Sequence, residues 1–132
     1  RLSDIAKPGL IRALPDVGDE GLVSLKKRLS DPNFNIFYNA PLLIFVSGVK
    51  SPYAIYDCSM AAQNMMLAAY MLGIGSCFIG TAVPAANSPN VKSTLGIPED
   101  HDVYAAVIFG YSKGGFPKAP PKRPAEILKR IN

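Results

Sequence analysis

The stretch DCSMAAQNMMLAAYMLGIGSCFIGT, residues 57–81, decides the fold. Its first part, from Asp57 to Leu72, predicts one helix, because Ala, Met and Leu are strong helix formers and Asp57 suits the N-cap position. Apolar side chains cover nearly every face of this helix, so we expect it to be buried, either in a core or against a second subunit. Gly73 is expected to adopt the left-handed backbone conformation that ends the helix.

The segment after this helix, IGSCFIG (residues 74–80), is too apolar for a solvent loop and too rich in glycine for a regular strand. It predicts a turn whose backbone approaches something flat or tightly packed. The dinucleotide-binding fingerprint is excluded, because that motif has a strand before its glycines and a helix after them. From the residues alone, a structural turn is favoured over a ligand contact.

Two continuous apolar runs of strand length, residues 42–49 and 102–110, predict buried strands. We also expect helices over residues 10–14, 16–29 and 89–95, and an extended tail that ends in a short helix or arm. Together these elements indicate an α+β fold. Two strands make a poor sheet, so the domain is expected to borrow strands from further sequence or from a partner chain.

Length and composition indicate a single globular domain over residues 1–132, with 48% hydrophobic and 18% charged residues. No apolar run is long enough for a membrane span, and the first ten residues lack a signal-peptide core, so we expect a cytoplasmic protein. The net charge of +4 comes from the tail. A basic tail without interleaved aromatic residues does not indicate nucleic-acid binding; it suits an anionic small molecule or simply solvent.

Several segments, taken as a set, resemble the FMN-dependent nitroreductase family. They are the helix and turn over residues 57–80, then Leu95–Pro98 (LGIP), Ile108–Tyr111 (IFGY) and Lys122–Pro124 (KRP). They follow the family's order, and the resemblance covers about residues 40–132. It implies an antiparallel sheet flanked by helices, a long buried central helix, a homodimer interlocked through that helix, and a C-terminal arm that wraps the partner.

The resemblance also implies an FMN site. In the family, the backbone of the turn lies along the flavin ring, which would give this role to Phe78, Ile79, Gly80 and Thr81. A basic residue before the proline contacts the FMN phosphate, which points to Arg123 first and Lys122 second, because guanidinium pairs well with phosphate. From sequence alone, these two side chains are better explained as solvated charges on a flexible tail.

The function that the resemblance implies is an FMN-dependent oxidoreductase. It would pass hydride from NAD(P)H through FMN to a nitroaromatic, a quinone or a similar acceptor, with no dedicated catalytic side chain, because the cofactor carries the chemistry. The alternative is a non-catalytic flavin- or ligand-binding module, or a dimeric structural module. The family's Arg-x-Ser-x-Arg motif has no match in residues 1–40, so we expect an N-terminally truncated fragment.

The remaining polar and aromatic residues predict no further site. Cys58 and Cys77 are expected to be small buried hydrophobes, and His101 an exposed loop residue. These residues lack metal-ligand spacing, so no metal site is predicted. Gln63 and Asn64 should hydrogen-bond in the core or across an interface, because buried amides need partners. Tyr111 and Phe116 are expected to pack against other residues rather than to stack on a substrate.

Overall fold

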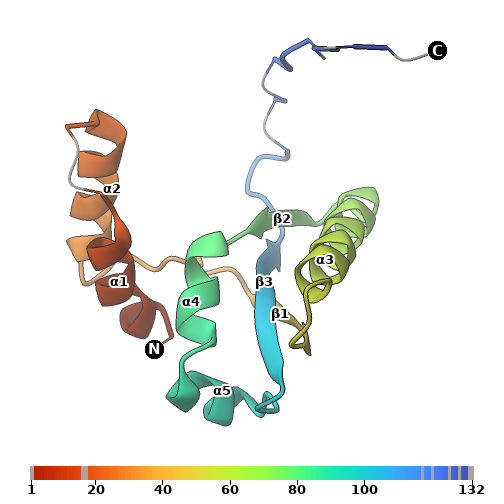
Figure 1. The fold of residues 1–132 in the computed structure, drawn as a ribbon. Coiled ribbons are helices and arrows are strands. Elements are labelled where there is room, and N and C mark those ends of the chain that lie inside the picture. Colours follow the sequence, from red (N-terminus) through yellow and green to blue (C-terminus); the bar gives the residue numbers. More distant parts are fainter. Residues whose placement is uncertain are drawn as a thin grey trace.

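The computed structural model shows a three-stranded antiparallel sheet with helices on both faces (Figure 1). The strand order is β1-β3-β2, where β1 is Leu42–Val49, β2 is Gly75–Phe78 and β3 is His101–Gly110. The structure describes residues 2–15, 18–116, 118–119, 121–124, 126–127 and 129–130. The predicted α+β class, with an antiparallel sheet flanked by helices, is confirmed.

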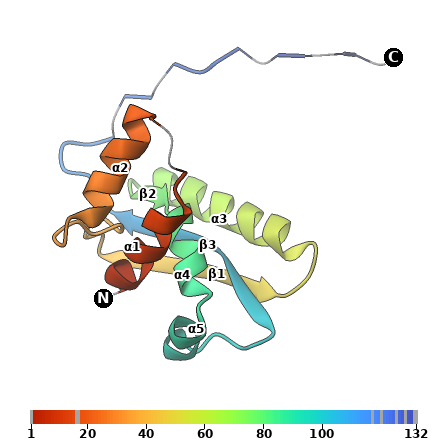
Figure 2. The same ribbon diagram turned by 60° about the vertical axis from the view of Figure 1, so that its left-hand side comes forward.

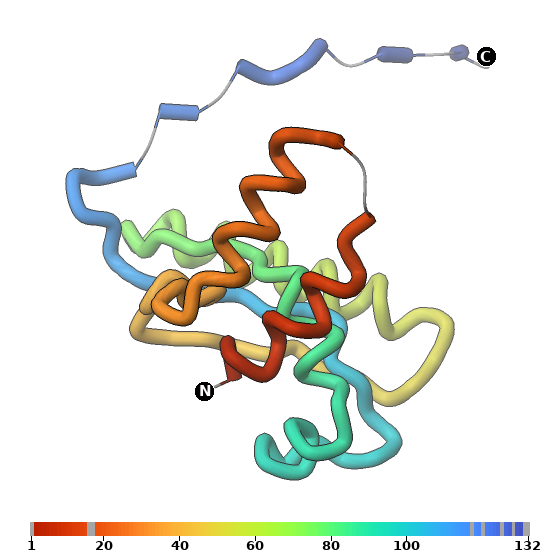
Figure 3. Tube along the Cα trace, turned by 90° about the vertical axis from the view of Figure 1, so that its left-hand side faces the viewer, coloured from red at the N-terminus to blue at the C-terminus, as the bar shows by residue number. Residues whose placement is uncertain are grey.

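The helices divide between the two faces of the sheet. They are α1 (Leu2–Ala13), α2 (Glu20–Ser30), α3 (Ala54–Met71), the 3-10 turn η1 (Gly80–Ala82), α4 (Val83–Ala86) and α5 (Pro89–Leu95). Helix α3 lies against one face, whereas α1 and α4 lie on the other, as Figures 2 and 3 show from two sides. Within the described ranges, none of these helices combines the length and the apolar character that a membrane span requires.

Strand β3 forms the centre of the core, because its side chains alternate between the two faces. Ala105, Val107 and Phe109 pack toward α3, whereas Ala106 and Ile108 pack toward α1 and α4. All five side chains are buried. A strand that is covered on both faces has to be apolar along its length, which explains why its sequence is a continuous apolar run rather than an alternating one.

The sheet contains a third strand that the sequence does not predict. Residues of β2 pair with β3 from Gly75 opposite Gly110 to Phe78 opposite Val107. A Cβ atom on Gly75 would lie 3.1 Å from the carbonyl oxygen of Gly110, so the glycine permits the close approach of the two strands. The expectation of only a turn over residues 74–80 is therefore wrong, and β3 has two neighbours without a borrowed strand.

Helix α3 begins at Ala54, one turn earlier than predicted. Its N-cap residue is Tyr53, whose side chain makes no capping bond, and the Ala54 N–H donates instead to Oγ of Ser51 at 3.1 Å. The N-cap predicted at Asp57 is thus wrong. Asp57 lies in the first turn, where its carboxylate interacts favourably with the helix dipole. The predicted end is confirmed, since Gly73 has a left-handed φ of 73°.

Helix α3 is expected to be buried in a core or against a second subunit, and within the chain only one of its faces is buried. Only one stripe of small side chains, Ala54, Cys58, Ala62 and Ala69, is fully buried against the sheet. The opposite face carries large exposed hydrophobic residues, namely Tyr56, Met60, Leu67, Tyr70 and Met71. An apolar composition around the whole helix therefore reflects two different surfaces, one packed on the sheet and one uncovered.

Helix α1 is longer than the predicted helix over residues 10–14, because two of its polar side chains are bonded to the loop before β1. The buried Ser3 Oγ accepts a hydrogen bond from the Ile36 N–H at 3.1 Å. The buried Lys7 Nζ donates to the Asp31 carbonyl at 2.9 Å. These tertiary bonds, which no local pattern reveals, hold the N-terminal helix on the domain.

The other two predicted helices are confirmed, α5 with the predicted bounds and α2 with shifted ones. Helix α5 occupies the predicted residues and is followed by Gly96 with a left-handed φ of 68°. Helix α2 begins at Glu20 rather than at residue 16, because the Asp19 side chain accepts a hydrogen bond from the Leu22 N–H at 3.1 Å. An aspartate at the N-cap sets the start of a helix in this way.

One side chain takes the place of a strand partner on β3. Strand β2 reaches only to Val107, so the N–H and C=O groups of Val103 have no strand neighbour on that edge. The Asn87 side chain fills both roles, since its Nδ2 donates to the Val103 carbonyl and its Oδ1 accepts from the Val103 N–H, each at 2.8 Å. The amide thereby links the end of α4 to the central strand.

Replacing Asn87 by alanine should lower the free energy of unfolding by about 1–3 kcal/mol, because two backbone groups of a buried residue lose their partner. Urea denaturation measures the change. The matched control is Asn90→Ala on α5, where the side chain is exposed. Equal unfolding midpoints for the two variants would show that the Asn87 bonds do not stabilise the fold.

Candidate functional site

The turn between α3 and β2 directs the chain to the edge of the sheet. The Ile74 N–H donates to the Ala69 carbonyl at 2.8 Å, and the Gly73 N–H donates to the Tyr70 carbonyl at 3.0 Å. These bonds satisfy the last carbonyls of α3 and reverse the chain, as in other glycine-ended helices. Strand β2 then runs antiparallel to β3, and it ends where the predicted flavin-contact residues begin.

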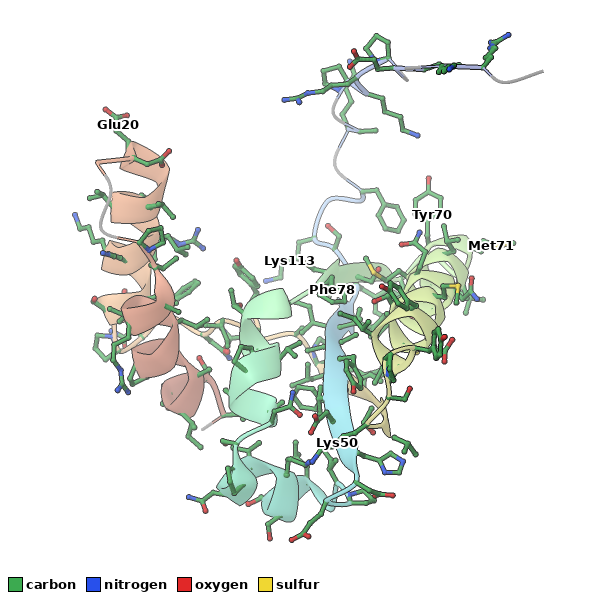
Figure 4. All side chains as sticks on the ribbon, viewed as in Figure 1. Glu20, Lys50, Tyr70, Met71, Phe78 and Lys113 are labelled. Atoms are coloured by element: carbon green, nitrogen blue, oxygen red, sulfur yellow. The ribbon has the colours of Figure 1, made fainter. Side chains whose placement is uncertain are left out.

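The four residues at this end of β2 have different environments. Phe78 is 43% exposed (Figure 4), whereas Ile79 is 6% exposed and its N–H donates to the Ala106 carbonyl at 2.7 Å. Gly80 is exposed and begins η1, and a Cβ atom there would lie 3.3 Å from Cε1 of Phe78. Thr81 lines a cavity of about 220 Å³ between α1 and α4. The structure thus brings Phe78 and Gly80 together on the surface and turns the side chains of Ile79 and Thr81 away.

A cavity of about 590 Å³ lies at the other end of β2. It is lined by Tyr38, Asn39, Ala40, Pro41, Gly75, Ser76, Cys77, Ile108, Phe109, Gly110, Tyr111, Ser112 and Lys113. Its residues come from three parts of the chain, namely the loop before β1, strand β2 and the end of β3. No sequence pattern predicts a site at these residues, because the three segments are brought together only in the folded sheet.

The loop at this cavity has an unusual backbone. Tyr38 and Asn39 have φ angles of 52° and 56°, in the left-handed region that residues other than glycine adopt at a cost. Asn35 holds the loop, because its Oδ1 accepts from the Phe37 N–H and its Nδ2 donates to Oδ1 of Asn39, each at 2.9 Å. Asparagine tolerates left-handed backbone, so Asn39, followed by Ala-Pro, is the feature of the sequence that could have indicated this loop conformation.

The predicted phosphate-binding residues lie apart from the turn. Lys122 and Arg123 are exposed, and Figure 1 shows the described parts of the tail leading away from the sheet after β3. Among the described residues, the structure does not bring them next to Gly80. Lys113, labelled in Figure 4, is the basic side chain of this region that lines the cavity at β2.

The two aromatic residues after β3 behave differently. The Phe116 ring packs against Tyr70 of α3 with a centroid distance of 5.0 Å, which confirms its predicted packing role. Tyr111 is 81% exposed and lines the cavity beside β2, so the packing role predicted for it is wrong. The chain turns outward directly after Gly110, and this leaves the Tyr111 ring at the cavity rim.

The two cysteines also differ from each other. Cys58 is buried, as predicted, and both burial and the nearby Asp57 carboxylate raise the pKa of its thiol. Cys77 is exposed, which contradicts its predicted burial. It sits on β2, where one edge of the strand has no neighbour among the described residues. Apolar neighbours in sequence suggested a core position, but the strand lies at the edge of the sheet.

The lone histidine, His101, is the first residue of β3, so its predicted position in an exposed loop is wrong. His101 is only partly exposed, and its Nδ1 lies 2.9 Å from Oδ1 of Asp100. This hydrogen bond lowers the pKa of the exposed Asp100 carboxyl. Within the described ranges, no three His, Cys, Asp or Glu side chains gather into a group that could hold a metal ion.

The family model named Nitroreductase family matches residues 8–111 of the chain. The matched segment contains helices α2 to α5, all three strands and the turn at Phe78–Thr81. The chain belongs to the nitroreductase family. The resemblance seen in the sequence over residues 40–132 is therefore confirmed at the level of the family, and the match also includes α2 and the second half of α1.

Individual relatives agree with this assignment. A protein of Archaeoglobus fulgidus, provisionally named NADH dehydrogenase/NAD(P)H nitroreductase, is 41% identical over 66 residues, which are 48% of this chain and 38% of the relative. A crystal structure of a nitroreductase with bound FMN from Bacteroides fragilis is 30% identical, with a TM-score of 0.71, over 99% of this chain and 70% of that chain. A second FMN-bound nitroreductase, from Desulfitobacterium hafniense, is 25% identical with a TM-score of 0.67, over 92% of this chain and 66% of that chain. The matched region thus spans less than half the length of the curated relative.

The difference between the cysteines predicts a selective reaction. A thiol-specific reagent should modify Cys77 rapidly in the folded protein and Cys58 only after unfolding, because the thiolate is the reactive form and burial opposes it. Mass spectrometry after brief labelling with iodoacetamide measures this, and Cys77→Ser should remove the fast reaction. Equal labelling of both cysteines in the native protein would contradict the described burial.

Proposed function

We propose that this protein is an FMN-dependent oxidoreductase of the nitroreductase type, which passes hydride from NAD(P)H through FMN to a nitroaromatic, a quinone or a similar acceptor. The observation that carries the proposal is the family match over residues 8–111, with a 30% identical relative whose crystal structure contains FMN. The name of the curated relative supports a nicotinamide donor. When bound, the flavin supplies the redox chemistry, and the protein positions it and tunes its surroundings.

The end of β2 fits a flat ring system. Gly80 is exposed and has no side chain, and the Phe78 ring lies directly beside it. Gly80 and Thr81 are the first residues of a helical segment, so their N–H groups have no acceptor within it and are free to donate to a ligand. Ile79 holds the turn to the sheet through its bond to Ala106. The proposed flavin contacts are therefore the Phe78 ring and the main chain of Gly80 and Thr81, with Ile79 as their anchor.

Gly80→Val should weaken FMN binding by about tenfold or more, which corresponds to about 1.4 kcal/mol, because the new side chain occupies the space that the ring needs. Flavin fluorescence titration measures the affinity. The control is Gly18→Val, since a Cβ atom at Gly18 meets nothing within 4 Å. If both variants bind FMN as the parent protein does, the turn is not the flavin site.

We propose Arg123, with Lys122 beside it, as the ligands of the FMN phosphate. Both are exposed, and Pro121 and Pro124 flank them, so the backbone there is extended and able to reach outward. Guanidinium offers phosphate two parallel hydrogen bonds and lysine a single point charge. For Arg123 to contact the phosphate of an FMN bound at the turn after β2, the tail has to move toward the edge of the sheet, while the sheet itself stays in place.

Arg123→Ala should weaken binding of FMN by about 10–100-fold, as expected from the loss of charge-assisted hydrogen bonds of about 1.5–3 kcal/mol. The same variant should bind riboflavin, which lacks the phosphate, as the parent protein does. Arg130→Ala, another arginine of the tail, is the control. A parallel loss of affinity for FMN and riboflavin would reject a phosphate contact.

We further propose that a second copy of the chain covers the exposed face of α3, giving a homodimer. The face runs from Tyr56 to Met71, and exposed apolar patches of this kind mark interaction surfaces. Figure 4 shows Met71 pointing away from the sheet at the end of this helix. Family membership supports a partner at the central helix, and the exposed face gives that partner a specific location.

The enzyme proposal as a whole is tested by adding FMN to the purified protein and following oxidation of NADH and NADPH with a nitroaromatic or a quinone. Turnover that depends on FMN supports it. Binding of FMN without oxidation of either nucleotide would favour the alternative, a non-catalytic flavin-binding module. Absence of FMN binding would reject the flavin proposal for this chain.

A further inference from the structure

The exposed face of α3 is apolar at its ends and polar in its middle. Tyr56, Met60, Leu67 and Met71 are 63%, 59%, 53% and 85% exposed. With 3.6 residues per turn, these four side chains follow one line along the helix, and Asn64 occupies the place between Met60 and Leu67. No charged residue occurs from Cys58 to Leu72. The line therefore consists of two apolar pairs separated by an amide.

The amides at the middle are the polar groups that a covering partner would have to satisfy. Asn64 and the adjacent Gln63 are both exposed, and neither side chain makes a hydrogen bond within the described part of the chain. The predicted alternative of bonding in the core is thus wrong, whereas bonding across an interface stays a prediction. In water they are hydrated, but under an apolar partner surface each would lose its hydration without compensation. A matching partner must present polar groups opposite the amides.

A second copy of α3, running antiparallel, meets this requirement when the twofold axis passes beside Asn64. Met60 then lies opposite the partner's Leu67, and Tyr56 lies opposite the partner's Met71. Asn64 lies opposite the partner's Asn64. Every apolar side chain of the line faces an apolar one, and the amides face each other and can hydrogen-bond as donor and acceptor. The complementarity follows from the symmetry of the pattern about its centre.

We propose that Asn64, supported by Gln63, fixes the register of an antiparallel α3 pair. This inference rests on the homodimer proposed above and deepens it, since apolar contact by itself tolerates several registers. A shift by one helical turn would place Asn64 against the partner's Met60 and bury an unpaired amide. A single polar residue in an apolar helix seam selects one register in this way, at some cost in affinity.

Single-cysteine crosslinking tests the register in the full chain, in a Cys58→Ala, Cys77→Ser background. Copper phenanthroline is the oxidant that accepts the two electrons, and the two protons go to solvent, when two thiols form one disulfide. We expect Asn64→Cys to give a crosslinked dimer, and Met60→Cys mixed with Leu67→Cys to give the mixed dimer. Ser59→Cys, exposed on another side of the helix, is the control and should stay uncrosslinked.

A second pair of variants separates failure of the register from failure of the dimer. Sedimentation should show that Leu67→Asp is monomeric and that Val23→Asp, an equally exposed apolar position on α2, is dimeric. In Asn64→Leu, the Met60–Leu67 pair should lose its selectivity while the dimer persists. Tyr56→Cys chains should then crosslink to Leu67→Cys chains, because a shift by one helical turn brings these two positions together. A dimer whose crosslinking pairs are unchanged in Asn64→Leu would overturn the register inference alone. A monomeric parent protein would overturn the dimer and the register together.

Discussion

The structure depends on the burial of strand β3. It is the central strand of the sheet, with β1 on one edge and β2 on the other, and helices pack on both of its faces. Each neighbouring element is attached to it by a specific interaction. Strand β2 requires a glycine at position 75 opposite the Gly110 carbonyl, the turn after β2 is bonded through Ile79, and α4 is bonded through Asn87. A substitution that displaces β3 is therefore expected to displace the proposed flavin-binding turn as well.

Helix α3 connects this core to the outside of the molecule. Its small residues, such as Ala62 and Ala69, let it lie close to the sheet, while its large residues face outward. In most surface helices the outer face is charged. Here it is apolar with two amides in the middle, so one helix serves the core of its own chain on one side and an external surface on the other.

The candidate site shows why sequence patterns reach some residues and not others. Gly80 could be singled out, because a glycine in an apolar turn is a local feature of the chain. The cavity formed by Tyr38, Cys77 and Lys113 could not, because these residues are far apart in sequence and meet only through strand pairing. Thr81 was assigned to the flavin by resemblance, yet its side chain lines a cavity toward α1.

The sequence by itself determined the α+β class, the strands β1 and β3, the long helix and its glycine end, and the membership of the nitroreductase family. The class and the elements come from local composition and periodicity, which act over a few neighbouring residues, whereas the family comes from the resemblance of several short segments taken as a set. Only the tertiary structure decided that Gly75–Phe78 is a strand, that Cys77 is exposed, and which face of α3 is buried. Each of these depends on a contact with a residue distant in the chain, Gly110 for β2 and Ala105 for the inner face of α3, and no local pattern contains that information.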